Sequence, residues 1–576
     1  MSMYNPSLSP DRIESILGRA TNWFHSYSPS RVAKWVLLSI AALYFIAMIL
    51  FQTGPINCWA ADVTIMLDGS WRIFNGQMPY RDFYLALGPL DYSLIALGMA
   101  LTHASTQAIA VGNAIFGIIV GVWSWSLCRR QIPFAPTVLI TAWVILTATS
   151  PSPLGAPANI MSPAMIYNRH GYAILSLILI ECFFSLKRTS FWGGVSSGAA
   201  GMLTIFLKLN FFFAAVLLIF ATFPTSRSEL KRSRGILGGA GFVLLLALVS
   251  LRSAVIPFLY DMRYAIHSRI GGVGFGAALK LGISNVELLT ALALTLITLM
   301  LVPRDHGWNK FAVRLALLCT AMVLSGLALR GTDFGEEGYQ LALLWTILLI
   351  AKLVETYTGG KERIAIPVAV LLCLAGIFVP LAHDADSWRT LLTYQSPSAK
   401  NAASRVLGME HMGLYPLDLA TMAQYKFETG TDFADYLNDG VYLLNQWSRP
   451  NESVLTVGYS NPFPYLLRRK PAIGGSPWLH EGNDISKTHP LDPAIVFGNA
   501  DLIMVPDSPS SHQDSDLDLQ VIYHKFLVNH YSFVARSHWW TLYRRDKGEN
   551  SAFNPSAQGY RAAAYPAKGQ LPLQAP

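Results

Sequence analysis

Charged side chains are scarce in this chain of 576 residues. Asp, Glu, Lys and Arg make up 14% of it, against about 25% in soluble proteins. Hydrophobic residues make up 52%, and the mean hydropathy is +0.37. Many apolar runs approach the ~20 residues that a helix needs to cross a bilayer. The composition excludes an ordinary soluble protein and predicts a polytopic α-helical membrane protein.

Cysteine is also rare, with five residues in the chain. Cys58 stands alone after the first apolar run, the other four lie in or beside apolar runs, and residues 383–576 contain none. This distribution does not indicate a disulfide framework or a redox compartment. The first apolar run follows a polar segment and lacks a small-residue cleavage site, so we interpret it as a retained signal anchor.

Several familiar catalytic motifs are missing. The chain has no His-Glu-x-x-His, Walker or paired Cys-x-x-Cys pattern, so the sequence does not indicate the corresponding chemistries. The net charge of +8 comes from basic residues in short loops between apolar runs, which is a topology signal. We therefore expect no nucleic-acid partner.

The apolar runs predict about eleven membrane spans within residues 1–382. Short basic loops mark the cytoplasmic side of a membrane protein, and an odd number of spans then places the N-terminus inside and the chain from residue 383 outside. We expect a multi-pass protein of the cytoplasmic (inner) membrane. The spans lie near 32–51, 107–127, 133–149, 171–186, 191–207, 209–223, 235–256, 285–303, 311–329, 339–355 and 363–382.

Two apolar segments need separate treatment. Residues 87–101 are short for a crossing, carry Asp91 and, if counted, would put Arg129 and Arg130 outside; we prefer an interfacial or re-entrant helix. The run 191–223 fits the basic-loop pattern only as two short spans broken at Lys208. Interrupted spans often mark a place where backbone lines a cavity.

Residues 383–546 have the character of a small extracytoplasmic (periplasmic) α/β domain. A helical pattern begins near Asp432, buried strands are expected at 453–458 and 500–506, and the aromatic, β-branched segments 532–536 and 541–545 predict an antiparallel pair. Residues 547–576 are rich in Ala, Pro, Gly and Gln and predict a disordered tail.

The most distinctive polar segment is the loop over residues 52–106. Carboxylates near a membrane are costly unless they face water or partners, so they indicate function. The loop contains Cys58-Trp-Ala-Ala-Asp62, Asp68, Gly76-Gln-Met-Pro79-Tyr80-Arg81-Asp82 and Gly88-Pro89. It resembles the first outer loop of GT-C glycosyltransferases, in style closest to the protein O-mannosyltransferases and lipid A aminoarabinose transferases. The resemblance implies a polyprenyl-phosphate-sugar donor.

By this resemblance Asp62 is the catalytic base, since the family's Asp follows the first span and precedes a Gly-x-x-x-Pro region. The alternative is that Asp62 caps a helix over 63–74. The family often has an Asp-Glu pair where this chain has Asp62-Val63. Asp68 is the rival base.

Glycosyl transfer also needs groups that bind the sugar and stabilise the departing phosphate. The family's phosphate-binding Lys falls at Gly88 here, so that contact is not carried over. For each other candidate a structural role is the alternative, such as a turn-stiffening ion pair or a snorkelling lysine. The candidates for substrate binding are Asp68, Tyr80, Arg81, Asp82, Arg169, His170 and Lys208.

The sequence thus predicts a GT-C-like membrane glycosyltransferase, a hexosyl- or pentosyltransferase that inverts the anomeric centre. The acceptor is a lipid, glycan or protein, the mechanism needs no cofactor, and a divalent metal stays open. Two alternatives remain. One is a transporter or flippase, which requires charged groups deep within spans. The other is a non-catalytic subunit of polysaccharide assembly whose outer domain is the functional part.

Overall fold

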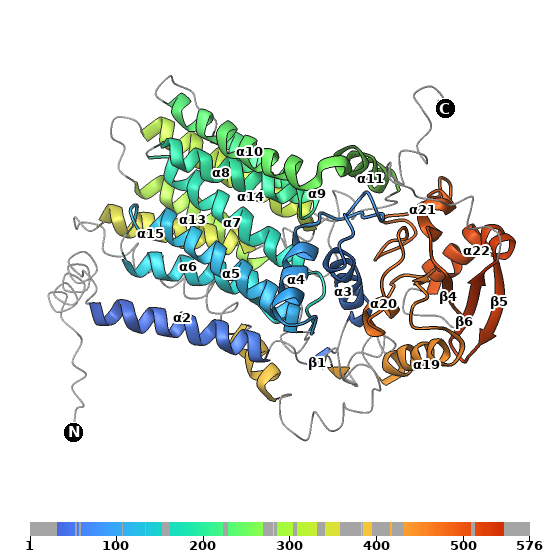
Figure 1. The fold of residues 1–576 in the computed structure, drawn as a ribbon. Coiled ribbons are helices and arrows are strands. Elements are labelled where there is room, and N and C mark those ends of the chain that lie inside the picture. The colour runs from blue at the N-terminus through green and yellow to red at the C-terminus, as the bar shows by residue number, and fades with distance from the viewer. Residues whose placement is uncertain are drawn as a thin grey trace, which may run out of the picture.

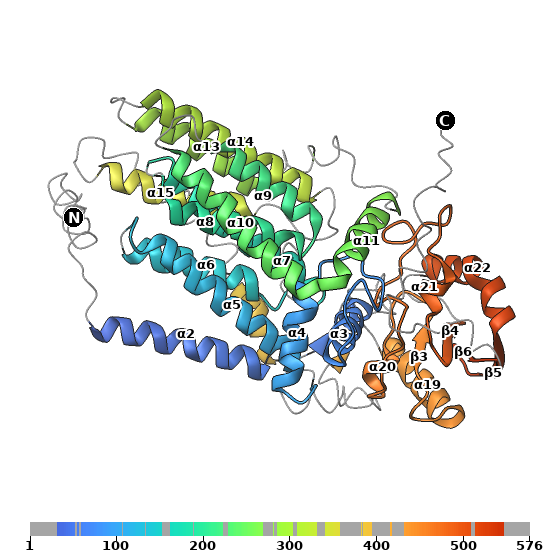
Figure 2. The ribbon, with the colours of Figure 1, turned by 45° about the horizontal axis from the view of Figure 1, so that its top comes forward.

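The computed structural model of the chain is a bundle of long helices with a smaller domain at one end (Figures 1 and 2). It describes residues 31–51, 55–56, 59–105, 107–132, 134–152, 162–187, 189–222, 229–268, 280, 285–302, 308–330, 340–357, 382, 384–393, 415–416, 431–507 and 513–546. Predictions for the span 363–382, the tail 547–576, Cys58 and Cys373 lie outside these residues.

The bundle is formed by ten helices of 13 to 23 residues among the described segments. They are α2 (Arg31–Phe51), α5 (Gln107–Cys128), α6 (Phe134–Thr149), α7 (Ile166–Ser185), α8 (Phe191–Ile205), α9 (Leu209–Ala221), α10 (Leu230–Leu251), α13 (Val286–Leu301), α14 (Trp308–Arg330) and α15 (Gln340–Tyr357).

These helices coincide with the first ten predicted spans, including the break at Lys208 between α8 and α9. By length and composition, four described stretches are suited to cross a membrane: 34–51, 107–128, 230–268 and 308–329. The helical membrane class is therefore confirmed, whereas eleven crossings and their sidedness stay predictions.

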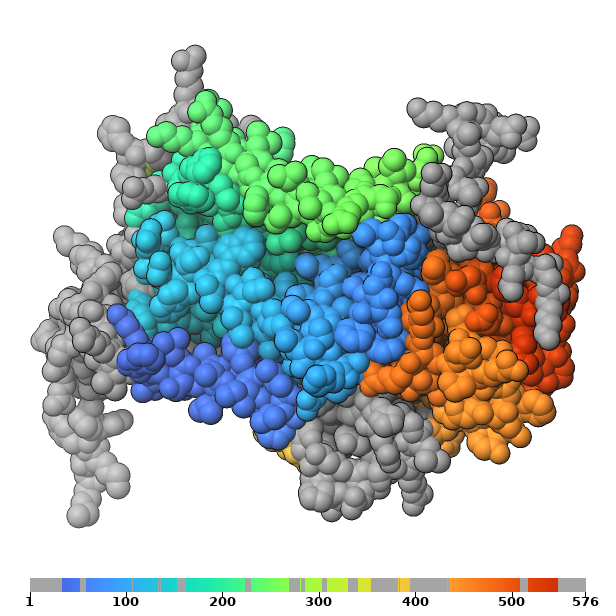
Figure 3. Space-filling model, viewed as in Figure 1, coloured from blue at the N-terminus to red at the C-terminus, as the bar shows by residue number. Residues whose placement is uncertain are grey.

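Apolar side chains cover both the inside and parts of the outside of the bundle. Its interior is a continuous cluster that includes Ile178, Leu218 and Trp345. The outer face of α2 exposes Trp35 and Leu43 to 69% and 64%, as expected for a surface that faces lipid. The space-filling view shows α2 lying along one edge of the bundle (Figure 3).

Helices α8 and α10 approach unusually closely, because glycines face each other across the contact. A Cβ added to any of these glycines would lie 2.0–2.1 Å from a backbone oxygen of the opposite helix. Small residues at such spacing allow two helix backbones to touch. The glycines are Gly194, Gly198, Gly235 and Gly239.

Two buried ion pairs link helices of the bundle, one between α7 and α10 and the other between Glu229, just before α10, and α14. Arg232 donates to Glu181 at 2.6 Å, and Arg314 donates to Glu229 at 2.5 Å. Arg232 is the third residue of α10, and Glu181 belongs to the last turns of α7. These charges lie near helix ends, whereas the transporter alternative requires charged groups deep within spans.

Between the bundle and the C-terminal domain lie α3 (Ala60–Phe74), α4 (Leu90–Leu101), the 3₁₀ turn η2 (Arg252–Ala254) and α11 (Val255–Ser268). With 12 residues, α4 rises about 18 Å, short of the ~30 Å hydrocarbon layer. Its interfacial or re-entrant position stays a prediction. A short parallel pair joins β1 (Pro55–Ile56) to β2 (Tyr415–Pro416).

The C-terminal domain is a four-stranded sheet in the order β3-β4-β6-β5 with helices around it. Strands β3 and β4 are parallel, and β4–β6 and β6–β5 are antiparallel. This confirms the predicted strands and the predicted antiparallel pair. The elements are α19 (Thr431–Trp447), β3 (Val454–Thr456), α20 (Phe463–Leu466), α21 (Pro493–Phe497), β4 (Leu502–Pro506), α22 (Gln513–His530), β5 (Tyr531–Arg536) and β6 (Trp540–Arg545).

The outer helix α3 and the C-terminal domain share one hydrophobic core. Buried Val63, Met66 and Trp71 of α3 belong to the same cluster as Phe463 and Tyr465 of the C-terminal domain. Apolar burial is the main favourable term in such contacts. The domain is therefore docked on the loop that carries the predicted catalytic carboxylate.

Candidate active site

Helix α3 begins three residues earlier than the sequence predicts. Its first residue is Ala60, and the residue before it, Trp59, has a left-handed backbone with φ of 52° and no capping side chain. Asp62 is therefore the third helical residue, and the alternative that it caps the helix is wrong. A carboxylate in the first turn is still favoured by the helix dipole.

Asp62 lies partly exposed beside the C-terminal domain. The hydroxyl of Tyr459 donates a hydrogen bond to its Oδ1 at 2.6 Å. The ring of Tyr459 is packed edge-on against Trp478 and His480, with ring centroids 6.5 and 5.3 Å away. The predicted base therefore meets an aromatic group of residues nearly 400 positions later in the chain.

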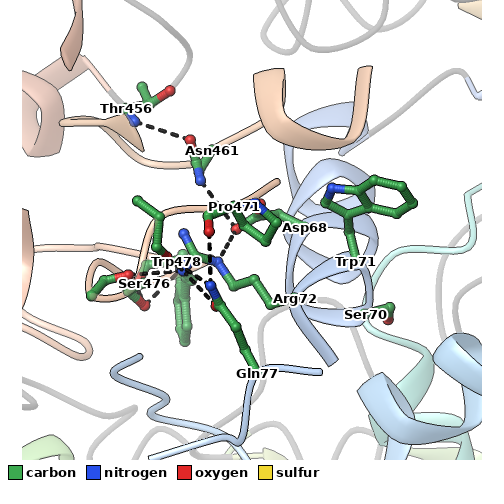
Figure 4. Close-up of polar contacts among 12 residues, drawn as sticks. Asp68, Ser70, Trp71, Arg72, Gln77, Thr456, Asn461, Pro471, Ser476 and Trp478 are labelled. Atoms are coloured by element: carbon green, nitrogen blue, oxygen red, sulfur yellow. Dashed lines mark hydrogen bonds and ion pairs between the residues drawn. The ribbon is translucent and has the colours of Figure 1, made fainter. Parts of the chain in front are cut away.

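Asp68, the rival base, has a different environment. Its side chain is fully buried, and Arg72 donates to Oδ2 at 2.8 Å. Asn461 also donates to Oδ2, at 3.2 Å, and is itself held by the backbone N–H of Thr456 (Figure 4). Burial raises the pKa of Asp68, and Arg72 opposes that rise. This buried carboxylate links α3 to the C-terminal domain through Asn461.

The same network fastens the end of α3 to residues 469–474. Arg72 donates to the carbonyls of Ala472 and Gly474 at 3.1 and 2.8 Å. Gln77 donates to the carbonyls of Pro471 and Ala472, and the Trp71 indole to that of Arg469. Figure 4 shows the Arg72 side chain reaching from α3 toward the C-terminal domain, with Gln77 beside it. Buried charge-assisted hydrogen bonds of this kind are strong.

Four carboxylates, from α3, α4 and the C-terminal domain, act electrostatically on Tyr92 of α4. Its ring lies over Gly69, where an added Cβ would come within 2.4 Å of it. Burial raises the pKa of the Tyr92 phenol, and the charges of Asp91, Asp484, Asp68 and Asp62 raise it further. Asp62 therefore lies in a strongly acidic region, in which Asp484 comes from the C-terminal domain.

Tyr80, Arg81 and Asp82 form a closed turn. Arg81 makes a bidentate contact with Asp82, with both distances 2.7 Å, and Asp82 also accepts from the backbone N–H of Met78. The buried Tyr80 hydroxyl donates to the carbonyl of Leu87 at 2.8 Å. These contacts correspond to the structural alternative, in which a local ion pair stiffens the turn.

Arg169 is buried at the start of α7. Its guanidinium donates to the backbone carbonyls of Ser150, Ser162 and Ala164, the last two at 3.0 and 2.6 Å. Basic residues are expected mainly in cytoplasmic loops, so an Arg on the predicted outer side suggested phosphate binding. In the structure these carbonyls supply partners for its charge.

His170 is the centre of a buried clasp between α4, α5 and α7. Its Nδ1 lies 2.6 Å from Oδ1 of Asp91, and its Nε2 lies 3.0 Å from Oδ1 of Asn113. The ring stacks on Phe116 with centroids 3.8 Å apart. Since the imidazole is 1% exposed, it holds three helices together and does not face a substrate in this structure.

Lys208 stands at the break between α8 and α9, partly exposed. Its Nζ lies 5.3 Å from the centre of the Tyr167 ring. The preceding residues Phe206 and Leu207 accept backbone hydrogen bonds from Leu90 and Gly88, both at 2.9 Å. The break therefore lies beside residues 88–90 of the loop 52–106.

Sequence reasoning placed the site in the membrane part and missed the residues that the C-terminal domain contributes. They are Tyr459, Asn461, Trp478, His480 and Asp484. The available signal is the turn after the predicted strand 453–458, where polar and aromatic residues follow a buried strand. Within the described part of the chain, no three His, Cys, Asp or Glu residues are grouped to hold a metal ion.

No protein-family model matches the chain, and no curated protein matches it. Among solved structures, the chain is similar to ArnT from Cupriavidus metallidurans bound to undecaprenyl phosphate, with a TM-score of 0.47, 12% identity and coverage of 90% of this chain and 99% of that chain. The apo ArnT of that organism gives 0.43, 12%, 89% and 98%.

Proposed function

We propose that this protein is a membrane glycosyltransferase that moves a sugar from a polyprenyl-phosphate donor to an acceptor hydroxyl, with Asp62 as the base. The observation that carries the proposal is the contrast along α3. Asp68 is fully buried in an ion pair, whereas Asp62 is partly exposed and held by Tyr459. A base must reach the proton that it removes.

The proposed reaction is a single displacement. The acceptor oxygen forms a bond to the anomeric carbon while its proton passes to the Asp62 carboxylate. The bond between the anomeric carbon and the phosphate oxygen breaks at the same time, and polyprenyl phosphate leaves with its new negative charge. One attack from the opposite face inverts the anomeric centre, and no enzyme nucleophile is needed.

Lys208 is the proposed contact for the departing phosphate. It lies at the N-terminus of α9, where backbone N–H groups and the helix dipole favour an anion. Arg81 and Arg169 are committed to Asp82 and to backbone carbonyls, so we place them second. Apolar helix faces at the bundle surface suit a polyprenyl chain.

The test uses purified protein in nanodiscs with a panel of polyprenyl-phosphate sugars, and measures release of polyprenyl phosphate. Release by the wild type and its loss in Asp62→Asn support the proposal. The matched control is Asp386→Asn, since Asp386 is an exposed carboxylate paired with Arg389. No release with any donor, together with unchanged envelope glycans by mass spectrometry when the protein is deleted, contradicts it.

A further inference from the structure

Tyr459 is a residue of the C-terminal domain whose side chain reaches the proposed base. The Tyr459 hydroxyl to Asp62 Oδ1 distance is 2.6 Å, and the Tyr459 side chain is 7% exposed. A phenol that donates to a carboxylate makes a charge-assisted hydrogen bond, which is shorter and stronger than a neutral one. The contact is therefore strong enough to fix the carboxylate on α3.

The position of Tyr459 is itself fixed by its backbone. Its N–H donates to Oδ1 of Asp516 on α22 at 2.7 Å. Its carbonyl accepts from the N–H of Leu479 at 3.3 Å, and the next residue, Ser460, forms a β-bridge with Trp478. The sheet domain therefore holds the phenol in place before any substrate arrives.

We infer that Tyr459 is a positioning residue for transfer, through which the C-terminal domain orients the Asp62 carboxylate toward the acceptor hydroxyl. This inference rests on the proposed function. Correct orientation of a catalytic group contributes substantially to rate, and a shift of 1 Å can cost about 100-fold. The membrane part alone would then hold an incomplete catalytic centre.

The hydrogen bond also has a consequence for pH dependence. A donor to the charged form of a carboxylate favours that form, so removal of the hydroxyl makes Asp62 easier to protonate. The acid limb of the rate profile then moves to higher pH. The other titratable groups that face this region are His480 and Asp484 from the C-terminal domain, Asp516 of α22, Asp68 of α3, and Asp91 and Tyr92 of α4.

The experiment measures transfer against pH for Tyr459→Phe in the full-length protein. We expect kcat to fall about tenfold with an unchanged KM for the donor, since Phe keeps the ring but not the hydroxyl. The acid limb should move up by about one pH unit, because a hydrogen bond to a charged group corresponds to roughly that shift.

The matched control is Tyr465→Phe. Tyr465 also joins the C-terminal domain to the outer region, but its hydroxyl donates to the backbone carbonyl of Ala104 at 3.1 Å. Its loss should leave the acid limb in place. If Tyr459→Phe does not fold, 3-fluorotyrosine at position 459 serves instead. Its more acidic phenol donates more strongly and should move the acid limb to lower pH.

The outcomes separate the inference from the function on which it rests. If Asp62→Asn is inactive while Tyr459→Phe keeps the wild-type kcat and acid limb, the inference is overturned and the proposed function stands. If Asp62→Asn transfers sugar at the wild-type rate, both are overturned. Equal shifts in Tyr459→Phe and Tyr465→Phe would assign the effect to domain docking and also overturn the inference.

Discussion

Two polar regions at the outer end of the bundle use similar residues in opposite ways. The clasp of His170, Asp91 and Asn113 is closed, since each of these side chains is at most 3% exposed. At the start of α3, Asp62 is partly exposed and accepts a hydrogen bond from the Tyr459 hydroxyl. A carboxylate near the membrane thus indicates function only when its partners leave it accessible.

The largest effect is expected from a substitution of Asp62, the partly exposed carboxylate of α3. Asp62→Asn keeps the size of the side chain and an acceptor for Tyr459 but cannot take a proton. We expect transfer to fall about 10²–10⁴-fold with little change in apparent Tm. Radiolabelled sugar transfer and differential scanning fluorimetry on the same preparation check this. Wild-type transfer by the variant would remove Asp62 from the mechanism.

A second test concerns the other carboxylate of α3. Asp68→Ala leaves the buried Arg72 without its counter-charge, and breaking a buried pair costs about 3–5 kcal/mol. We expect a marked loss of thermal stability and increased protease cleavage between α3 and the C-terminal domain. If Asp68→Asn instead keeps its stability but abolishes transfer, Asp68 is the base and the two roles must be exchanged.

A third test uses the pH dependence of stability to examine Asp484, the buried carboxylate that the C-terminal domain contributes near Tyr92. Burial raises the pKa of Asp484 well above its ordinary value, so its ionisation favours the unfolded chain as pH rises above about 4. Asparagine does not titrate. The stability of Asp484→Asn relative to wild type should therefore grow as the pH rises from 5 to 8. A constant difference in apparent Tm between the two proteins over this pH range would contradict a raised pKa of Asp484 in the folded protein.

A fourth test addresses the cation at the helix break. Lys208→Gln should raise the donor KM about five- to tenfold and lower kcat, because the phosphate is charged in the donor and gains charge on departure. Lys208→Arg should be milder, since a point charge suffices for a contact of this kind. Donor titrations with a polyprenyl-phosphate sugar measure both. Unchanged donor affinity and turnover in Lys208→Gln would make Arg169 the better candidate for the phosphate contact.

The smallest expected effect is in the closed turn. Arg81 is 36% exposed and paired with Asp82, and partly exposed ion pairs contribute about 0–1 kcal/mol. Arg81→Lys should change the apparent Tm slightly and leave the donor KM unchanged. A clear rise in the donor KM would instead show that the planar guanidinium contacts the phosphate.

The sequence predicted the fold where local pattern determines it. The helices of the bundle, the break at Lys208 and the paired strands 531–536 and 540–545 all follow from periodicity and charge. The start of α3 did not, because the left-handed Trp59 allows the helix to begin before Asp62. No local signal marks such a start.

The site was less predictable because its partners are distant in the chain. Asp68 has a local ion-pair partner in Arg72, four residues later. The partners Tyr459 of Asp62 and Asn461 of Asp68 belong to the C-terminal domain, nearly 400 residues later. Phosphate binding was expected of Arg169 because basic residues are rare in loops on the predicted outer side. The carbonyls of Ser162 and Ala164 that receive it lie in a loop whose path the sequence does not specify.

The glycine contact between α8 and α10 has a mechanical consequence. Two helices whose backbones touch along several turns are expected to bend together as one rigid unit. This pair is interrupted at one end, at residues 206–208 after α8 and at Arg252, with φ of 45°, after α10. We therefore expect the pair to bend at these breaks, one of which lies beside Gly88 and includes Lys208, the proposed contact for the lipid phosphate.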